Sequence, residues 1–390
     1  MIKGAGYLII GSLLVVSNVQ AQQLPDTLTC SPSIRIEPLA QETPLPQKNN
    51  IFKRFVTAFN AIDTTYITPN KYNWAFMIQN TNSFENYKLH SRERDQQLVF
   101  SPKPAFKIGP YLGWRWIFLG YTFEVASLGQ GAYSRKTELE LSLYSAMLGC
   151  DLIYRRTGND FRLRKVTGFG EEAESVEGTS CKGINVKVTG INTYYVFNHK
   201  RFSYPAAFAQ STVQRKSCGT WKVGLSCTQH ELDFNYKGLP EELTHDETHQ
   251  LSPEFMFDKL KYTDLSFSVG YAYNWVFKRN FLLCASISPA IGYKITHIDP
   301  ISESENESTL GTEVTNPFFP IHLNDFNFDV IGRLGLVWNN TKYFAGLSLI
   351  IHNYNYRHRK LSINNTFGTL NFYIGLNFNK RKEYRNESNK

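Results

Sequence analysis

The sequence predicts an all-β protein, an antiparallel transmembrane up-and-down β-barrel of about 12 strands with a short N-terminal amphipathic helix. Three observations lead to this class. The chain contains 28 Phe and 22 Tyr, and aromatic residues make up 14% of its length. Long segments alternate apolar and polar residues with a period of two, and no segment after residue 21 is apolar enough to span a membrane as a helix. A membrane protein without such helices satisfies its backbone groups by closing a sheet.

The alternation is clearest in 263–277, where every odd position from Leu265 onward is apolar or aromatic and most even positions are small or polar. A turn at 278–280 leads into 281–295, which has the same pattern. Strands of soluble proteins usually have about 5–6 residues, whereas tilted barrel strands need about 9–11 to cross a bilayer. The length favours a membrane barrel over a soluble β-sandwich, in which one solvated face per sheet would leave the outward rings unexplained.

Ten further segments share this alternation and are expected to be strands: 72–90, 98–113, 116–127, 136–148, 150–165, 184–197, 218–236, 322–338, 342–356 and 366–379. The links between strands alternate in length, as expected for short periplasmic turns and longer outer loops. The short links are Trp114-Arg115, Leu148-Gly149, 278–280 and 339–341, and the long ones are 91–97, 128–135, 166–183, 237–261, 297–321 and 357–365.

One link breaks this rule. Residues 198–217 should form a short periplasmic turn but are long and contain Pro205. The segment either folds into the lumen or periplasmic mouth, or it hides a hairpin that would raise the count to about 14 strands. Proline is awkward inside a sheet, which favours the first alternative.

The N-terminal region has the layout of a secretory signal peptide over residues 1–21: Lys3, an uncharged apolar run, and small residues at Val19 and Ala21. The apolar run is shorter than the roughly 20 residues that a spanning helix needs. Four further segments are expected: a flexible periplasmic lead over 22–50, the amphipathic helix over 51–62, the barrel over 72–379, and a basic tail over 380–390. This organisation predicts export to the outer membrane of a Gram-negative cell.

If the apolar strand faces point to lipid, the opposite faces line the lumen. The charged candidates for this lining are Lys103, Lys107, Glu124, Glu138, Glu140, Asp151, Arg155, Lys187, Lys222, Asp264, Lys294, Asp325, Asp329 and Arg333. Their signs are mixed, whereas a pore selective for ions of one sign would show a ring of one sign. Acids and bases can pair in a confined interior. We therefore expect a partly filled barrel with a structural or narrow-channel role.

No catalytic residue is assigned. Ser226, His230 and Asp233 lie on one expected strand, but along an extended chain they are too far apart for a hydrolase triad, and no GxSxG motif is present. An outer-membrane acyl-lipid hydrolase is kept as an alternative. A second alternative is a surface-binding module that acts through the outer loops 237–261 and 297–321.

Neither a metal nor another cofactor is expected. His245 and His249 have the i, i+4 spacing of metal ligands on a helix, but they lie in an expected outer loop. The six cysteines show no CxxC pair, and their pairing is left open. The net charge is +8 with Lys and Arg scattered along the sequence, so nucleic acid is not an expected partner. Outer-membrane lipid is an expected partner. The barrel-assembly machinery is also expected, because the last strand ends on Phe378.

Three segments resemble a known family. They are 63–73, the Gly-rich hairpin 107–121, and 202–211 with the following Gln214–Ser217. Together they are similar to an uncharacterised envelope family, the domain of unknown function DUF4421, over about residues 50–380. The resemblance implies an exported β-barrel and implies that the unusual link at 198–217 is a family feature. It implies no catalytic or binding residues.

Overall fold

The computed structural model describes residues 62–114, 117–120, 122–124, 137–158, 161–170, 172–181, 183–244, 251–299 and 326–385. The expected signal peptide, the lead and all but the last residue of the expected helix lie outside these ranges. Over the described ranges, no helix has both the length and the apolar character needed to cross a membrane.

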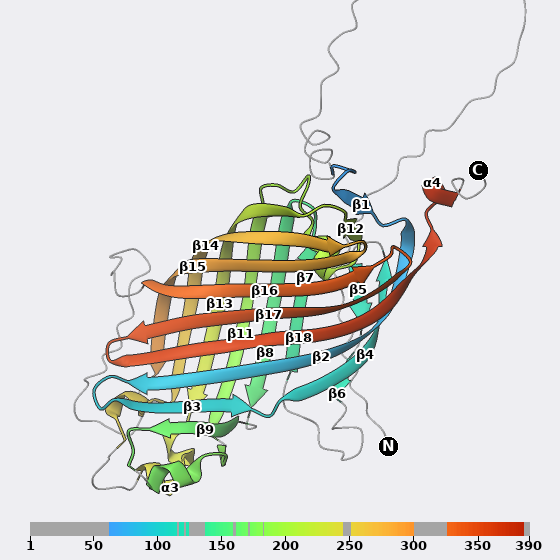
Figure 1. Cartoon of the computed structure of the whole chain (residues 1–390). Coiled ribbons are helices and arrows are strands. Elements are labelled where there is room, and N and C mark those ends of the chain that lie inside the picture. The colour runs from blue at the N-terminus through green and yellow to red at the C-terminus, as the bar shows by residue number, and fades with distance from the viewer. Residues whose placement is uncertain are drawn as a thin grey trace, which may run out of the picture. The chain divides into compact units, whose positions relative to one another are not determined.

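An antiparallel sheet dominates the structure (Figure 1). Its strands are β2 (Tyr72–Ser91), β3 (Gln96–Pro102), β4 (Ala105–Trp114), β5 (Ile117–Gly120), β6 (Phe123–Glu124), β7 (Thr137–Tyr144), β8 (Leu148–Gly158), β9 (Phe161–Thr167), β10 (Ser180–Cys181), β11 (Ile184–Val196), β13 (Cys218–Phe234), β14 (Lys259–Lys278), β15 (Phe281–Asp299), β16 (Phe326–Asn339), β17 (Tyr343–His358) and β18 (Leu361–Lys380). Two short strands, β1 (Ile67–Pro69) and β12 (Thr212–Gln214), pair separately.

The sheet curls because its first and last long strands pair. β18 lies antiparallel to β2 from Leu361 opposite Ser91 to Lys380 opposite Tyr72. Along its length β2 then pairs with β3 and with β4. β8 pairs with β11, and β9, which follows β8 in the chain, pairs with β3. The sheet is thereby carried around a lumen, although no backbone pairing joins β7 to β5 or β6 among the described residues.

The two ends of this barrel differ. One end carries the turn between β17 and β18 and the short helices η2 (Glu172–Val176), η3 (Tyr236–Gly238), α3 (Glu241–Thr244) and η4 (Pro253–Phe255), and we call it the cap end. The other end carries the turns β14–β15 and β16–β17, α2 (Tyr204–Phe208) and α4 (Lys382–Arg385), and we call it the plug end.

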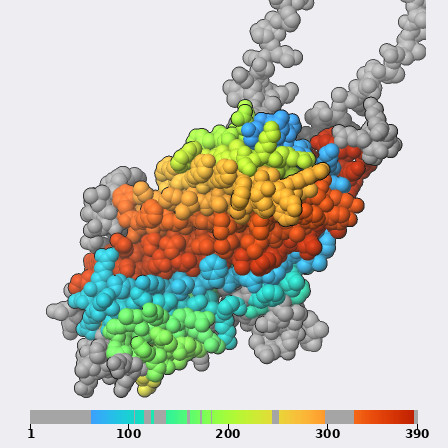
Figure 2. All heavy atoms as spheres, in the orientation of Figure 1, coloured from blue at the N-terminus to red at the C-terminus, as the bar shows by residue number. Residues whose placement is uncertain are grey.

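The middle of the sheet is apolar outside and polar inside. On β14 the outward residues Leu265 and Phe267 are 47% and 51% exposed, while the inward Asp264 and Asn274 are fully buried. The alternation predicted for 263–277 and 281–295 is therefore present. On the face shown in Figure 2, β14 to β18 and β2 form a continuous wall.

Toward the cap end the polarity is reversed. Tyr354 and Tyr356 of β17 and Ile363 of β18 are buried inside, and polar residues face outward. The long loop expected at 357–365 was wrong: β17 and β18 are joined by the two residues Arg359 and Lys360. The error arose because the outward polar residues were taken for a loop. The short link expected at Leu148-Gly149 was also misplaced, since both residues belong to β8.

The unusual link at 198–217 folds into the barrel, as the first of its two alternatives predicted. It contains α2, whose residues Tyr204 to Ala207 are buried. Ser203 caps this helix by accepting a hydrogen bond from the backbone N–H of Ala206. The rest of the link forms β12, which pairs with β1 outside the main sheet.

Candidate functional site

The lumen is closed at the cap end by an apolar cluster that we call the cap core. Its fully buried members include Leu98, Phe100, Phe161, Leu163, Val188, Phe234, Phe255 and Phe367. Aromatic pairs tighten it, with ring centroids of Phe234 and Phe257 5.3 Å apart.

Hydrogen bonds fasten the segment around η4 to the strand ends. The hydroxyls of Ser91 and Ser252 lie 2.6 Å apart, and each donates to the carboxylate of Glu254, at 3.0 and 2.8 Å. The backbone N–H of Ser252 donates to Gln96 Oε1 at 2.8 Å. The cap is thus held by polar contacts as well as by its apolar core.

The plug end is closed by the segment 198–217, which we call the plug. The hydroxyls of Tyr204 and Ser286 are 2.7 Å apart, and Asn274 Nδ2 donates to the carbonyl of Ser203 at 3.0 Å. Gln210 Oε1 accepts a hydrogen bond from Asn339 Nδ2 at 3.0 Å, and Gln210 Nε2 donates to the hydroxyl of Tyr373 at 2.8 Å. These contacts reach β14, β15, β16 and β18, so the plug is tied to four strands.

Aromatic rings fill the space around the plug. Tyr204 packs edge-on against Phe202 at 5.1 Å and Tyr194 at 5.7 Å, and Phe208 stacks on Tyr144 at 5.7 Å. Among the described residues, a short helix and its flanking residues therefore separate the lumen from the plug end.

Between the two closures lies a layer of buried charge, which we call the central layer. It comprises Glu85, Lys107, Glu138, Glu140, Asp151, Arg155, Lys222, Asp264, Lys294, Asp329 and Arg333. Period two on β2, β4, β7, β8, β13, β14, β15 and β16 turns all of these side chains inward.

Arg333 and Asp151 form one ion pair of this layer. The guanidinium of Arg333 also donates to the hydroxyl of Tyr144 at 2.8 Å. Asp151 also accepts from Ser142 Oγ at 2.7 Å and Asn192 Nδ2 at 2.8 Å. Such a charge, almost fully buried, is tolerated because it is paired and hydrogen-bonded.

Two further charge groups lie deeper toward the cap. Lys294 Nζ is 3.2 Å from Asp264 Oδ2 and 3.1 Å from Asp329 Oδ2, so one cation serves two carboxylates. At Glu138 one carboxylate serves two cations, with Lys107 Nζ at 2.7 Å and Arg155 Nη2 at 2.6 Å. Mixed signs in close pairs are what the sequence predicted for a filled lumen.

Some buried polar groups that face the lumen have no hydrogen-bond partner in the described part of the chain. They include both ring nitrogens of His230 and of His352, the hydroxyl of Ser288, and the hydroxyls of Tyr194 and Tyr354. Lys222 Nζ lies over two rings, 5.2 Å from Tyr194 and 5.4 Å from Tyr204. Polar groups of this kind are ordinarily satisfied by water.

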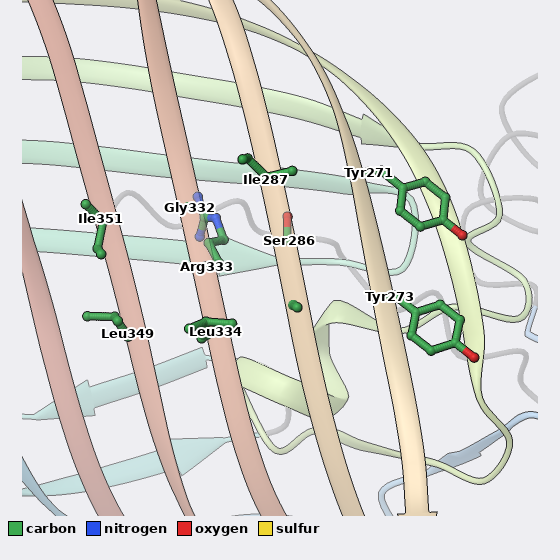
Figure 3. A pocket seen from close by; sticks show the side chains of 10 residues that line it. Tyr271, Tyr273, Ser286, Ile287, Gly332, Arg333, Leu334, Leu349 and Ile351 are labelled. Atoms are coloured by element: carbon green, nitrogen blue, oxygen red, sulfur yellow. The ribbon is translucent and has the colours of Figure 1, made fainter.

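A hollow of about 430 Å³ lies on the sheet's outward face over β14 to β17 (Figure 3). The rings of Tyr271 and Tyr273 stand along one side of it (Figure 3). It exists because small residues, Ala285 and Gly332, occupy outward positions between larger neighbours. It belongs to the apolar outer surface.

A family model described as a domain of unknown function, DUF4421, matches residues 61–378. This chain belongs to the DUF4421 family. None of the curated proteins matches the sequence of this DUF4421 protein.

Similar solved structures include three β-proteins. The translocator domain of the autotransporter NalP from Neisseria meningitidis is 8% identical, with 84% of this chain and 94% of that chain covered and a TM-score of 0.32. The β domain of the Bordetella autotransporter BrkA is 9% identical, with 76% and 98% covered and a TM-score of 0.28. The outer membrane protein OprG from Pseudomonas aeruginosa is 7% identical, with 80% and 98% covered and a TM-score of 0.21.

Eleven of the fourteen charged residues proposed as lumen lining turn inward in the DUF4421 structure. Ten of these eleven belong to the central layer, and the eleventh, Glu124, is half-buried on β6. The other three are not part of this inward set. Lys187 lies on the outward face of β11, 43% exposed and 3.7 Å from Glu231, so its assignment was wrong. Lys103 is exposed in the break between β3 and β4, and Asp325 lies outside the described residues.

Sequence reasoning missed Glu85, His230 and His352 as members of the lumen. Glu85 shares the inward face of β2 with Ser83 and Tyr87, so the same period-two pattern could have found it. His352 Nε2 is 3.8 Å from Glu140 Oε1.

The hydrolase candidates are not brought together. Ser226 Oγ pairs with Ser266 Oγ at 2.5 Å, His230 stacks on Tyr262 at 4.6 Å, and Asp233 lies on the opposite face of β13. His245 and His249 fall outside the described residues.

Proposed function

We propose that this DUF4421 protein is an outer-membrane β-barrel that acts as a narrow, gated conduit and is closed at rest. The membrane assignment is supported by the outward apolar band. Its exposed members include Phe76, Ile78, Leu112, Leu152, Ile191, Leu225, Phe267, Ile287, Phe328, Leu336 and Ile374. These come from strands all around the barrel, as the lipid-facing band of a transmembrane barrel does.

The band implies twelve crossings. Three pairs of strands, β3 with β4, β5 with β6 and β8 with β9, follow each other within two or three residues and extend one another along the wall. Each of these pairs counts as one bent crossing. The three pairs, the strands β2, β7 and β11, and the six consecutive strands from β13 through β18 make twelve crossings. We propose that the plug end lies in the periplasm and the cap outside, because an even count with short turns at one end is typical of the periplasmic side.

The observation that carries the conduit proposal is the central layer itself. Burying charge is costly even when ions are paired, and replacing a buried ion pair by apolar residues is often neutral or stabilising. A purely structural barrel could fill its middle as the cap end is filled, with Phe, Leu and Tyr. This chain instead keeps a polar, ion-paired layer at the level of the apolar band.

The plug is the closure that fits a gate. It is a single short segment, and side-chain hydrogen bonds from residues such as Asn274, Ser286 and Asn339 tie it to the wall. The cap core is a larger apolar cluster built from many strands. Displacing the plug breaks the side-chain hydrogen bonds of one short segment, whereas the cap core joins many strands. A continuous path also requires the cap to open, and that part of the path is apolar.

Planar bilayers test this proposal. The wild-type protein is expected to conduct rarely, and a variant with 202–211 replaced by a short Gly-Ser turn is expected to show frequent, reproducible conductance steps. Heat-modifiable migration on gels establishes that both barrels are folded. A folded, inserted deletion variant that conducts no more than the wild type would contradict the gated conduit and leave a structural barrel.

We propose no enzymatic activity, because the separation of Ser226 from His230 and Asp233 leaves no nucleophile activated along this strand. Outer-membrane lipid and the barrel-assembly machinery remain the proposed partners.

The cap favours a second candidate function, surface binding. Its short helices rest on a packed core, which would present a rigid face outside the cell. Loss of ligand binding on replacing 236–257, with the barrel intact, would support it.

A further inference from the structure

Positive charge gathers at the plug end of the barrel. Twelve basic residues lie in the turns and strand ends there: Lys71, Lys200, Arg201, Arg215, Lys216, Lys278, Arg279, Lys342, Lys380, Arg381, Lys382 and Arg385. We call this set the basic collar. Asp63 and Glu383 are the carboxylates in the same described segments, so the excess is ten positive charges, against +8 for the whole chain. The rest of the molecule therefore has a negative balance.

The collar faces solvent. All its members except Lys71 and Arg381 are exposed, and those two are half-buried. Asp63 neutralises part of one side through Arg201, with Nε 3.4 Å from its Oδ2. A concentration of exposed cations of this size repels itself unless anions lie near.

The collar begins where the apolar band ends. Lys278 directly follows Phe277, which is 45% exposed, and Lys342 Nζ lies 5.2 Å from the ring of Tyr343. Lys380 comes two residues after the exposed Phe378. Aromatic rings mark the interface of a membrane, and long basic side chains beside them extend to the headgroups.

The collar is an arc. Its cations come from the ends of β2 and β18, from the turns β16–β17 and β14–β15, and from the plug before β13, and these strands are consecutive neighbours in the sheet. On the opposite wall the turn between β7 and β8, residues 145–147, carries no charge. One side of the periplasmic rim is therefore strongly basic.

We propose that the basic collar binds the phosphates of anionic phospholipids in the periplasmic leaflet of the outer membrane. This inference rests on the proposed function, because it needs the apolar band to lie in lipid. Cations that continue outward from a lipid-facing aromatic rim lie at headgroup height, which favours lipid phosphates over an acidic protein. Attraction to an anionic surface strengthens with each basic residue near it and is screened by salt.

The test uses two matched variants. K278Q/R279Q/K342Q/K380Q removes four exposed cations from the collar, and K88Q/R156Q/K165Q/R357Q removes four exposed cations from the cap half of the barrel. Each protein is reconstituted into phosphatidylcholine bilayers with a minor share of spin-labelled phosphatidylglycerol or, in parallel, spin-labelled phosphatidylcholine. The ratio of motionally restricted to free label gives the relative affinity for the two headgroups.

The wild type and the cap variant are expected to prefer phosphatidylglycerol, and the collar variant is expected to lose this preference about ten-fold. High salt should reduce the wild-type preference in the same direction. An unchanged preference in the collar variant, or an equal loss in the cap variant, would overturn the proposal. So would a collar variant that keeps its lipid preference but no longer retains an acidic periplasmic protein.

Two further outcomes distinguish a failure of the collar proposal from a failure of the proposed function. A wild type that inserts with heat-modifiable migration yet shows no headgroup preference overturns the collar proposal alone. A wild type that inserts into neither bilayer overturns the membrane barrel itself.

Discussion

Glu138 of β7 binds Lys107 of β4 inside the barrel, with 2.7 Å between Oε2 and Nζ. The other carboxylate oxygen of Glu138 accepts from Arg155 of β8 at 2.6 Å. The pair spans the part of the wall where, among the described residues, β7 has no backbone pairing with β5 or β6. Side-chain charge therefore contributes to closing a seam that the backbone ladder leaves open.

Glu138→Gln should weaken this seam, because it leaves Lys107 and Arg155 without their shared carboxylate. Breaking a buried ion pair from one side costs about 3–5 kcal/mol, and partial exposure of Glu138 places the expected loss near the lower limit. Urea unfolding in lipid vesicles measures it. Lys187→Gln, on the outward face, is the control and should change stability by less than about 0.5 kcal/mol. Equal stability of E138Q and wild type would show that the seam does not depend on the pair.

Gly149→Ala should destabilise the barrel near the plug. A Cβ at Gly149 would lie 2.1 Å from the ring of Tyr194, whereas a Cβ at Gly332 would meet nothing within 4 Å. Overpacking of this kind costs about 1–3 kcal/mol. The midpoint of thermal unfolding should fall for G149A and remain unchanged for G332A. A fall of the same size in both variants would remove the packing explanation.

Gln210→Ala should loosen the plug without unfolding the barrel. The substitution leaves Asn339 Nδ2 and the hydroxyl of Tyr373 without one partner each, and unpaired buried groups cost about 1–3 kcal/mol apiece. If the closed state loses about 1 kcal/mol or more of stability relative to the open state, the open probability should rise at least about five-fold. Single-channel recording checks the rise, with Gln229→Ala on the outside of β13 as the control. No change in open probability would place the gate elsewhere.

Phe234→Ala should cost about 3–5 kcal/mol, because Phe234 is fully buried in the cap core. Phe267→Ala, on the outward band, should cost less, since its neighbours there remain in lipid. Protease cleavage near η4 should accelerate in F234A and not in F267A. The reverse order would mean that the outward band, rather than the cap, holds the protein's apolar core.

The sequence predicted the regular middle of the barrel well, because period two along β14 and β15 forces one face out and one face in. It failed where polarity changes along a strand. On β17 the outward Asn353 and Asn355 are polar while the inward Tyr354 and Tyr356 are apolar, which reverses the pattern nearer the plug end. A strand that passes from lipid into water switches faces in this way. Residues 353–356 lay within an expected strand, and the error came directly after them, where 357–365 was expected to be a loop but contains the end of β17 and the start of β18.

The interior was foreseen as mixed charge, but the partners were not. Asp264 and Asp329 are far apart in sequence, and both lie within ion-pair distance of Lys294. The basic residues were likewise read as scattered. Lys278 and Lys380 end β14 and β18, Lys342 lies in the turn between β16 and β17, and the antiparallel return of each strand brings them to one rim.

The most direct test of the account is a depth profile along β14. Single nitroxide labels at residues 261, 265, 269, 273 and 277, introduced through cysteine in a background freed of native cysteines, report oxygen and aqueous nickel-chelate access in reconstituted bilayers. Outward-facing labels should be deepest near Val269, become shallower toward Phe277, and be fully aqueous at Lys261. Uniform water access at all five positions would contradict a membrane-spanning barrel whose cap end stands clear of the lipid.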